Sequence, residues 1–507
     1  MSRILLLAAL VTVPLVTAVT GCGDGAAGTT AGGSSLATGE VTGQASGTGT
    51  SGTGETPTGG TGEATQASDP TAGTATQTDP TATTDPTATT GPDETTGGQP
   101  GCAPALPTFA DGKVASSRVY VTAGAAPGGD GSEAKPFAGL QEALGVVGPG
   151  GEVRIAGELP AATYVVGLAG SADAPIWISG EPGAKIGPLT LEGASHVIVQ
   201  DLELSGSADG HVLHFFFADH LLMRRLKIHD AGLGCIKGSQ TTDAFVEDSE
   251  LWAAGKVNGH PVLDFVGVNG GHIVRSEFHD TPGVMIMLKG GTSDLLFAWN
   301  ELHHQTAPGN ALSLGQSTGP EFFQPLDAAF EGLRIVAFAN LLHDLVGPPV
   351  AFEGCKDCAA VRNTIWNCSG PQLVRFLPGA AGMNSGVQVS KPEGCRFTGN
   401  IVVGGQEGGA SLNADDGNTG PGNSLDYNVF LKPGALNWWG TLAQDMVYST
   451  YDQDPQLDAA GVPANVALVD GKGPPDLEGL PFAGVFVRDA AGACITQPGD
   501  IGAFEVP

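Results

Sequence analysis

Basic residues are scarce in this chain. Its 507 residues include 22 Lys and Arg against 53 Asp and Glu, which gives a formal net charge of −31. Proteins that hold nucleic acids by the phosphate backbone need clusters of Lys and Arg. We therefore expect no nucleic-acid partner, and a polyanionic ligand only where local cations override the negative mean field.

Aromatic and charged residues are also sparse, at 6% and 15% of the chain, whereas 79 residues are Gly. This composition, with only short apolar runs in most of the chain, is typical of a turn-rich β protein. Seven cysteines follow Cys22, and because seven is odd, at least one must stay free or pair outside the chain.

The longest apolar run lies at the N-terminus, from Ile4 to Val19, after the single positive charge of Arg3. This is the layout of an export signal, and the run is too short and too weakly flanked for a mature membrane span. We expect residues 1–21 to be a signal peptide.

The run ends in Val19-Thr20-Gly21-Cys22, which resembles the lipobox of bacterial lipoproteins. The resemblance implies that Cys22 becomes the first mature residue and carries acyl chains, two or more of which anchor a protein stably to a membrane. Gly23, rather than Asp, follows the cysteine, which implies the outer membrane or cell surface as the destination.

Lys and Arg are absent from residues 23 to about 101, where Gly, Thr, Ala, Ser and Pro dominate and TDPTAT occurs twice. Such low-complexity sequence has too few large apolar residues for a core, so we expect residues 22–117 to be the lipidated cysteine and a disordered linker. Its 79 low-complexity residues would span about 50 Å on average.

From residue 118 to 507 the sequence repeats. Each copy is a short alternating strand, a small polar residue, a second short strand and a Gly-containing turn. The copies start 24, 23, 29, 22, 39, 25 and 37 residues apart, at positions 196, 220, 243, 272, 294, 333, 358 and 395. Strands this short are stable only when stacked on their neighbours, which favours a solenoid over a β-sandwich or propeller.

A polar ladder supports this interpretation. The position after the first strand holds Ser249, Ser276, Asn300, Asn340, Asn363 and Asn400 in successive copies, with Leu202 and Leu226 in the first two. Asn tolerates a left-handed bend, and stacked Asn amides can bond along the axis. The sequence therefore predicts an all-β, right-handed parallel β-helix, capped by an N-terminal helix within residues 132–147.

The segment VYVTAGAAPGGDGSEAKPFAGLQEAL (119–144) resembles the opening of many pectate-lyase-like β-helix proteins. The runs MIMLKGGTSDLLFAWNELHH (285–304), GPPVAFEGCKDCAAVRNTIWN (347–367) and DIGAFE (500–505) are similar to an uncharacterised group of bacterial β-helix proteins. The resemblance covers residues 119–507 and implies the fold, without an established reaction.

Two lysines are candidate catalytic residues, because each ends a short strand before a Gly-bearing loop: Lys237 in GCIKG and Lys289 in MIMLKGG. β-Helix polysaccharide lyases use a Lys or Arg base next to a cation that neutralises a uronate carboxylate. The alternative for both lysines is a solvent-facing turn. For a glycoside hydrolase the candidate carboxylates are Asp243, Asp248, Glu250, Asp264, Glu277 and Asp294.

An imidazole and indole column follows the second strand, at His229, Trp252, His279, His303, His343 and Trp366. We interpret it as a structural stack rather than a metal or proton-transfer surface, because Trp cannot ligate a metal. Cys355, Cys358, Cys368 and Cys395 suggest zinc, but disulfides between stacked coils fit an exported protein better. We assign no metal site and no cofactor, although Ca²⁺ is a candidate ligand of the loop 413–423, which includes Asp415-Asp416.

Two functions remain open. The first is a monomeric, surface-tethered β-helix that binds carbohydrate or is structural, with Trp252, Trp366, Trp438 and Trp439 as sugar-stacking platforms. The second is a polysaccharide lyase or glycoside hydrolase acting on extracellular glycans. The surroundings of Lys289 discriminate between them, since a groove with a second cation and carboxylates favours the lyase.

Cys22→Ala removes the proposed acylation site. We expect this variant to lose incorporated radiolabelled fatty acid and to move from the detergent phase to the aqueous phase in phase partitioning. Ser34→Ala, in the same low-complexity stretch, is the matched control and should behave as the parent protein. Retained label in Cys22→Ala would contradict lipid attachment at this residue.

Overall fold

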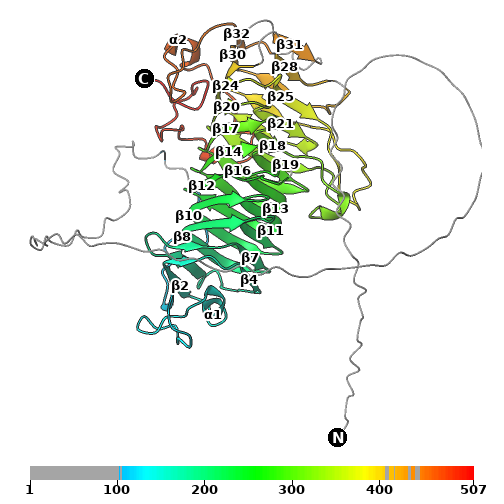
Figure 1. Ribbon diagram of the computed structural model, residues 1–507. Coiled ribbons are helices and arrows are strands. Elements are labelled where there is room, and N and C mark those ends of the chain that lie inside the picture. Colours follow the sequence, from blue (N-terminus) through cyan, green and yellow to red (C-terminus); the bar gives the residue numbers. More distant parts are fainter. Residues whose placement is uncertain are drawn as a thin grey trace, which may run out of the picture. The chain divides into compact units, whose positions relative to one another are not determined.

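The computed structural model describes Cys102 and residues 106–257, 259–405, 410–415, 417–431, 436–439 and 446–507. The expected signal peptide, Cys22 and most of the expected linker lie outside these residues. The described chain forms a right-handed parallel β-helix (Figure 1), as the repeats predicted, and every pair of strands between turns is parallel. None of the described helices is both long and apolar enough to cross a membrane.

The solenoid begins with a short cap. Helix α1 (Leu140–Leu144) buries Leu140, Ala143 and Leu144 against the first turn, so the predicted cap is present but shorter than the predicted segment. The elements of the first turns are β1 (Ser117–Thr122), β2 (Gly151–Ala156), β3 (Glu158–Leu159), β4 (Thr163–Val166), β5 (Ile176–Gly180), β6 (Lys185–Ile186) and β7 (Leu189–Glu192).

Each later turn contributes to three faces, and four long strands bend around a corner to serve two of them. These strands are β8 (Ser195–Ser207), β10 (Asp219–Ala231), β11 (Ile236–Glu247) and β13 (Leu263–Val274). We name the three faces by their position or side chains: the lysine face, the covered face and the imidazole face.

The lysine face consists of residues 236–239 of β11, residues 263–266 of β13, and β9 (Leu213–Phe216), β15 (Ile286–Lys289), β18 (Leu312–Leu314), β21 (Val350–Glu353), β25 (Gln372–Leu377), β28 (Ala410–Asn413) and β31 (Leu436–Trp439). The covered face consists of residues 197–200, 221–224, 244–247 and 271–274 of the long strands, and β16 (Thr292–Ala298), β19 (Gly332–Phe338), β22 (Cys355–Lys356), β23 (Ala359–Val361), β26 (Arg396–Thr398) and β29 (Ser424–Asp426).

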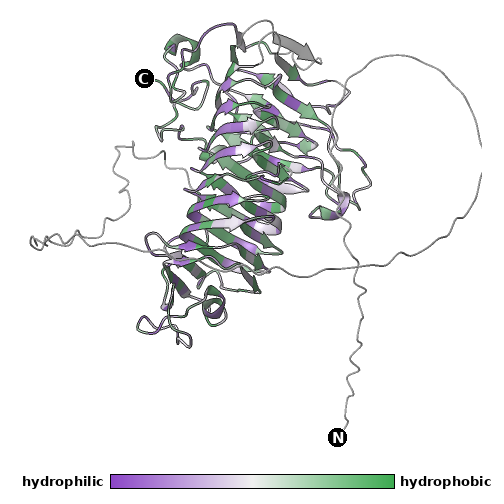
Figure 2. Ribbon diagram, viewed as in Figure 1, coloured by the Kyte–Doolittle hydropathy of each residue, from purple (hydrophilic) through white to green (hydrophobic). Residues whose placement is uncertain are grey.

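The imidazole face consists of residues 203–205 and 226–229 of the long strands, and β12 (Glu250–Trp252), β14 (Glu277–Pro282), β17 (Glu301–Ala307), β20 (Leu341–Leu345), β24 (Thr364–Cys368), β27 (Ile401–Gly404), β30 (Val429–Leu431) and β32 (Thr450–Tyr451). Inward-facing aliphatic and Phe side chains from all three faces form one continuous core along the axis. Figure 2 shows the resulting alternation of hydrophobic and hydrophilic residues along the strands.

The polar ladder is confirmed and is longer than predicted, since Asn428 continues it. From Asn300 to Asn400, each buried Asn donates its Nδ2 to the Oδ1 of the next Asn, over 2.8 to 3.1 Å. The same Oδ1 accepts the backbone N–H of the preceding rung, and each Nδ2 also bonds a strand carbonyl such as Ile273 O.

One reason given for the ladder was wrong. The left-handed backbone at this corner belongs to the residue before each ladder position, for example Trp299 (φ 56°) and Ala339 (φ 51°). Asn is therefore selected for its amide, which satisfies buried backbone groups of two turns at once, and not for tolerance of the bend.

The covered face takes its name from chain segments that lie over it. Outward-facing Leu296 and Phe338 pack against Leu480 and Phe486 of the C-terminal segment, whose short helices are α2 (Val466–Val469) and η3 (Ala483–Val485). At the other end, Phe109 packs near Trp177 and Phe245. Residues 106–116 fall within the segment that we assigned to the linker, yet they lie against the solenoid.

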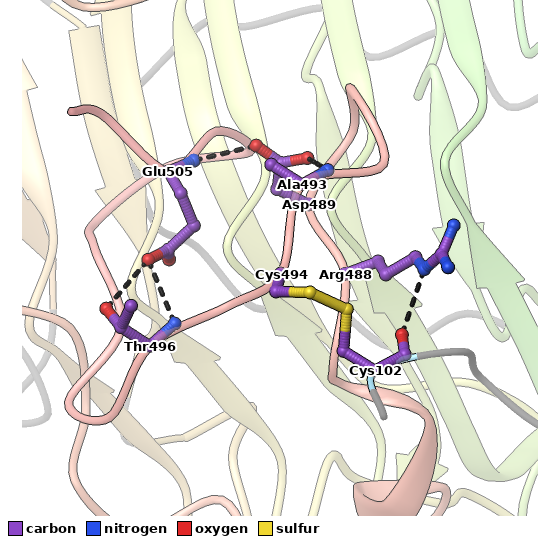
Figure 3. Close-up of a disulfide and its surroundings, with 7 residues drawn as sticks. All are labelled: Cys102, Arg488, Asp489, Ala493, Cys494, Thr496 and Glu505. Carbon is purple, nitrogen blue, oxygen red and sulfur yellow. Dashed lines mark hydrogen bonds between the residues drawn. A yellow bond between two sulfur atoms is a disulfide. The ribbon is translucent and has the colours of Figure 1, made fainter. Parts of the chain in front are cut away.

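A disulfide joins Cys102 to Cys494, 392 positions apart, and Arg488 donates its Nε to the carbonyl oxygen of Cys102 at 2.9 Å (Figure 3). The expected disulfides between stacked coils are absent among the described residues. Cys355, Cys358, Cys368 and Cys395 are free and buried, because they face the core, where Cys355 and Cys395 contact each other at 3.5 Å.

Asn340→Leu should lower the free energy of unfolding by about 3 kcal/mol, because it removes the acceptor of the Asn300 backbone and side-chain N–H groups and the Nδ2 donor to Phe297 O in the core. Urea titration followed by circular dichroism measures the effect. The exposed Asn384→Leu is the control and should change stability by about 0.5 kcal/mol or less. Equal midpoints for the two variants would contradict a stabilising ladder.

Candidate functional site

The two candidate lysines lie on the same face of the solenoid. Lys237 is aligned with His214 on the turn before and Asp264 on the turn after, and this outward column continues through Met287, Ser313, Ala351 and Arg375. Lys289 stands two residues further along its own strand, so it belongs to the adjacent column. The intervening residues, such as Phe265 and Leu288, are buried in the core.

Lys237 and Asp264 form a buried ion pair. Asp264 is 5% exposed, and Lys237 donates to its Oδ2. Burial alone would raise the pKa of Asp264, but the charges of Lys237 and Lys289 outweigh burial and lower this pKa. The other carboxylate oxygen, Oδ1, is buried without a hydrogen-bond partner in the described structure. A buried acceptor in this state is available to a ligand or a water molecule.

Lys289 ends strand β15 and is half-buried. Among the described residues its side-chain amine forms no hydrogen bond and no ion pair within 4.0 Å, whereas its backbone oxygen accepts a hydrogen bond from Thr292 Oγ1 at 2.7 Å. Its charge still acts on Asp264, His260 and Glu353. Glu353 lies in the same column, two turns after Lys289. The position between these two residues is Gly315, which has no side chain. Burial raises the pKa of Glu353.

The turn after Lys289 is held by a fully buried carboxylate. Glu331 accepts backbone N–H bonds from Gly290, Thr318 and Ala380, at 2.7 to 3.0 Å. Burial raises the pKa of Glu331 to about 7, although these N–H groups act in the opposite direction. Glu331 thereby ties two inserted loops to the strand end that carries Lys289.

Three histidines surround the Lys237–Asp264 pair. Burial lowers the pKa of His211 to about 4, and the charge of Lys237 adds to this effect. Burial also lowers the pKa values of His214 and His260. His211 accepts the Gly234 N–H at its Nδ1 (3.0 Å), so its proton is on Nε2 near pH 7.

Arg375 is a third cation of this face, and the sequence interpretation missed it. Its guanidinium donates to Asn310 Oδ1 at 3.0 Å, and its Nε is buried without a hydrogen-bond partner in the described structure. Burial lowers the pKa of Arg375, and Glu353 acts against this. The lysine face therefore combines three cations with the carboxylates of Asp264 and Glu353.

Three of the carboxylates proposed for a hydrolase, Asp248, Glu250 and Glu277, line one pocket together with Glu301. Asp264 lies on the lysine face, Asp248 pairs with Arg275, and Asp294 pairs with Arg334. Glu250 and Glu277 lie on the imidazole face next to His279 and His303. Asp264 and Asp294 are not among the residues that line this pocket.

The imidazole and indole column is a continuous stack. Adjacent rings from His229 to Trp366 lie 4.3 to 5.6 Å apart, with planes within 20° of parallel. The outer nitrogens of His303 and His343 face Glu277 and Glu301 of the preceding turns, at 2.8 and 2.9 Å. The rings are thus stacked as expected of a structural role, although His279 Nε2 is buried without a hydrogen-bond partner in the described structure.

This stack also changes the platform prediction. Trp252 lies between His229 and His279, and Trp366 stacks on His343, with Gly461 near its six-membered ring. Neither indole therefore offers an open face to a sugar. The side chains of Trp438 and Trp439 lie outside those that the structure describes.

The cysteines do not form a metal centre among the described residues, since the one group of three or more potential ligands there is His196, Asp219 and His220. In the Ca²⁺ candidate loop, Asp415 accepts the Gly417 N–H at 3.0 Å. Asp416 lies outside the described residues.

No protein-family model matches this chain, and no curated protein matches it. Solved structures that resemble it are pectate-lyase-like β-helix proteins. Pectate lyase Pel9A is 12% identical with a TM-score of 0.47 and matches 78% of this chain and 98% of its own. XylC in complex with xylose is 9% identical with a TM-score of 0.49, over 77% and 98%.

The surface protein and adhesin PfbA of Streptococcus pneumoniae is 9% identical, with a TM-score of 0.39, over 62% of this chain and 94% of its own. Identities this low bear on the fold alone. The function of this chain must therefore be argued from its own residues.

The depressed pKa of His211 predicts a pH dependence of stability. Between about pH 4 and 6.5 the unfolded chain binds a proton at this residue and the folded chain does not, so stability falls as the pH falls. Between pH 7.5 and 5, His211 should contribute a loss of about 2 kcal/mol.

Comparison with His211→Gln isolates this contribution, because Glu331, with its raised pKa, acts in the opposite direction in both proteins. Urea unfolding at the two pH values provides the measurement. An identical pH dependence in the parent and the variant would contradict a neutral, buried His211.

Proposed function

We propose that the lysine face binds an acidic polysaccharide and cleaves it by β-elimination, and that the lipid on Cys22 holds the enzyme at the outer membrane or cell surface. The observation that carries the enzymatic part is Lys289. It is a half-buried amine without a hydrogen-bond partner among the described residues, on the same face as Lys237, Arg375 and the half-unsatisfied Asp264.

The charges explain how a strongly acidic protein can hold an acidic glycan. Lys237, Lys289 and Arg375 are three of only 22 Lys and Arg in the chain, and they occupy one face. The positive charge of Lys237 is largely neutralised by Asp264. In the described part of the chain, Lys289 and Arg375 have no carboxylate oxygen within 4.0 Å. These two are therefore the groups that a ligand carboxylate would meet, and partial burial strengthens such contacts.

β-Elimination requires little of the protein beyond this arrangement. We assign the role of base to Lys289, whose Nζ, once it has given up its own proton, takes the proton on the carbon next to the uronate carboxylate. The electron pair forms a carbon–carbon double bond and expels the glycosidic oxygen, which takes a proton from an acid. Arg375 neutralises the carboxylate, and half-buried His260, whose ring feels the charge of Lys289, is positioned near enough to be that acid.

Binding without cleavage is the second candidate function. A glycan-binding surface would also be expected to hold Lys237 in an ion pair and to have most of its polar side chains hydrogen-bonded, as Arg375 and Glu353 are. Hydrolysis requires two carboxylates across one bond. On the lysine face Asp264 is bound by Lys237. Asp248, Glu250 and Glu277 do share a pocket, but they are paired with Arg275, Lys227 and His303, respectively.

Lys289→Met should lower the rate of eliminative cleavage by about 10² to 10⁴-fold, the range that a general base contributes. Release of unsaturated uronates from a panel of acidic polysaccharides, followed by ultraviolet absorbance, measures this rate. Lys391→Met, which removes an exposed lysine, is the matched control and should cleave at the parental rate.

The panel separates the two functions. Binding of one glycan without any product would replace the lyase with a binding protein. If the parent protein binds and cleaves none of the acidic glycans, or if Lys289→Met cleaves as fast as the control, the proposed function of this face is wrong.

A further inference from the structure

A second cluster of chemically active side chains lies at the corner between the lysine face and the covered face. His196 and His220 occupy equivalent positions on successive turns, and Asp243 follows on the third. All three have left-handed backbones, with φ of 50°, 52° and 53°. Because the conformation repeats, their side chains leave the same corner in the same direction.

The donor atoms of this corner converge on one carboxylate oxygen. Asp219 Oδ2 lies 3.0 Å from His220 Nδ1 and 3.8 Å from His196 Nδ1. Ser195 Oγ lies 3.0 Å from the same oxygen, and His220 Nε2 lies 3.4 Å from Asp243 Oδ2. Ligand atoms around tetrahedral Zn²⁺, with bonds of 2.0 to 2.1 Å, are about 3.3 Å apart, which these separations bracket.

The charges at this corner are unbalanced. Asp294 and Asp248, at comparable corner positions, each form an ion pair with an arginine of the next turn. Asp219 and Asp243 have no Lys or Arg within ion-pair distance in the described structure; their partners are the imidazoles. Two carboxylates and two imidazoles without a nearby cation are suited to receive a divalent one.

The imidazole face shows how histidines look when they are only structural. At His343 both ring nitrogens are bonded, to Glu301 and Asp344, although His279 Nε2 of the same stack has no hydrogen-bond partner in the described structure. At His196 only Nδ1 has a partner among the described residues, the hydroxyl of Ser195 at 2.9 Å.

We propose that His196, Asp219 and His220, with Asp243 beside them, form a binding site for a divalent transition-metal cation of the Zn²⁺ type. Two imidazoles and a carboxylate suit such a cation better than Ca²⁺, which prefers oxygen ligands. All three residues are partly exposed, so water or a ligand can reach the remaining coordination position. This site does not depend on the proposed activity of the lysine face.

A bound cation would connect consecutive turns through side chains as well as through the backbone. It would also sit under the segment that follows Cys102, because the ring of Phe109 packs edge-on against His196 and His220, at 5.5 and 5.9 Å. Metal binding should therefore stabilise both the early turns of the solenoid and the attachment of that segment.

Calorimetric titration of the full-length, chelator-treated protein with Zn²⁺ tests the site. We expect one Zn²⁺ per chain and a higher thermal unfolding midpoint when it is bound. His220→Gln and Asp219→Asn should each weaken binding by more than about 100-fold. His279→Gln removes an imidazole from the stack on the imidazole face, is the matched control, and should bind like the parent.

Co²⁺ gives a second readout that does not depend on stability, because its visible spectrum reports imidazole and carboxylate coordination. The parent and His279→Gln should give that spectrum, and folded Asp219→Asn should not. Three results would overturn the proposal: no Zn²⁺ binding by the parent, equal affinity in all variants, or loss of binding in His279→Gln alone.

Discussion

The hydrogen-bonded ladder of buried Asn side chains fixes how the turns of this solenoid lie on one another. An amide that bonds the next amide, the backbone N–H of the preceding rung and a strand carbonyl of the preceding turn has one good position. A shift of one residue would break all of these bonds in the core and turn every outward side chain inward. Because this register is kept, residues far apart in the chain form straight columns on each face, and the columns give the faces their separate chemistry.

The three faces divide the limited charge of the chain. The lysine face carries Lys289 and Arg375, the imidazole face alternates ring stacks with glutamates, and the covered face carries Arg224, Lys356 and Arg396 beside its apolar side chains. Apolar outward residues such as Leu296 and Phe338 would be exposed on a bare solenoid, so the covering segment from 477 to 486 is part of the fold and not an appendage. His196, Asp219 and His220 lie together at the corner between the lysine face and the covered face.

Much of this architecture could be predicted from the sequence, because a solenoid repeats its interactions within one turn. The ladder from Ser249 to Asn400, the capping helix and the stacking role of the His column follow from local spacing. The C-terminal segment that packs on the covered face is not part of the repeats, so the repeat pattern does not predict it. Its signal was present in strands that do not alternate, such as Leu295-Leu296-Phe297-Ala298, since a strand that is apolar on both sides must be buried on both sides.

Only some residues of the candidate site could be predicted from the sequence in this way. Lys237 and Lys289 could be found because each ends a strand at a glycine turn. Glu353 and Arg375 could not be placed beside them, because loops that lengthen the repeat to 39 and 37 residues hide which positions share a column. His211 and His260 lie in turns without a repeating pattern, so only the folded chain brings them to Asp264. The disulfide was missed because its partners lie at opposite ends of the repeats.

That disulfide closes a covalent ring around the solenoid, since both the chain entering the first turn and the chain leaving the last are joined at Cys102 and Cys494. Stacked repeats contact only their neighbours, and under tension they tend to come apart one at a time from a free end. Here a force applied through the chain before Cys102 is transmitted both to the first turn of the solenoid and, through the disulfide, to the C-terminal segment at Cys494. Neither end is then free, and a protein held to a membrane on one side and to a polymer on the other would resist mechanical unravelling.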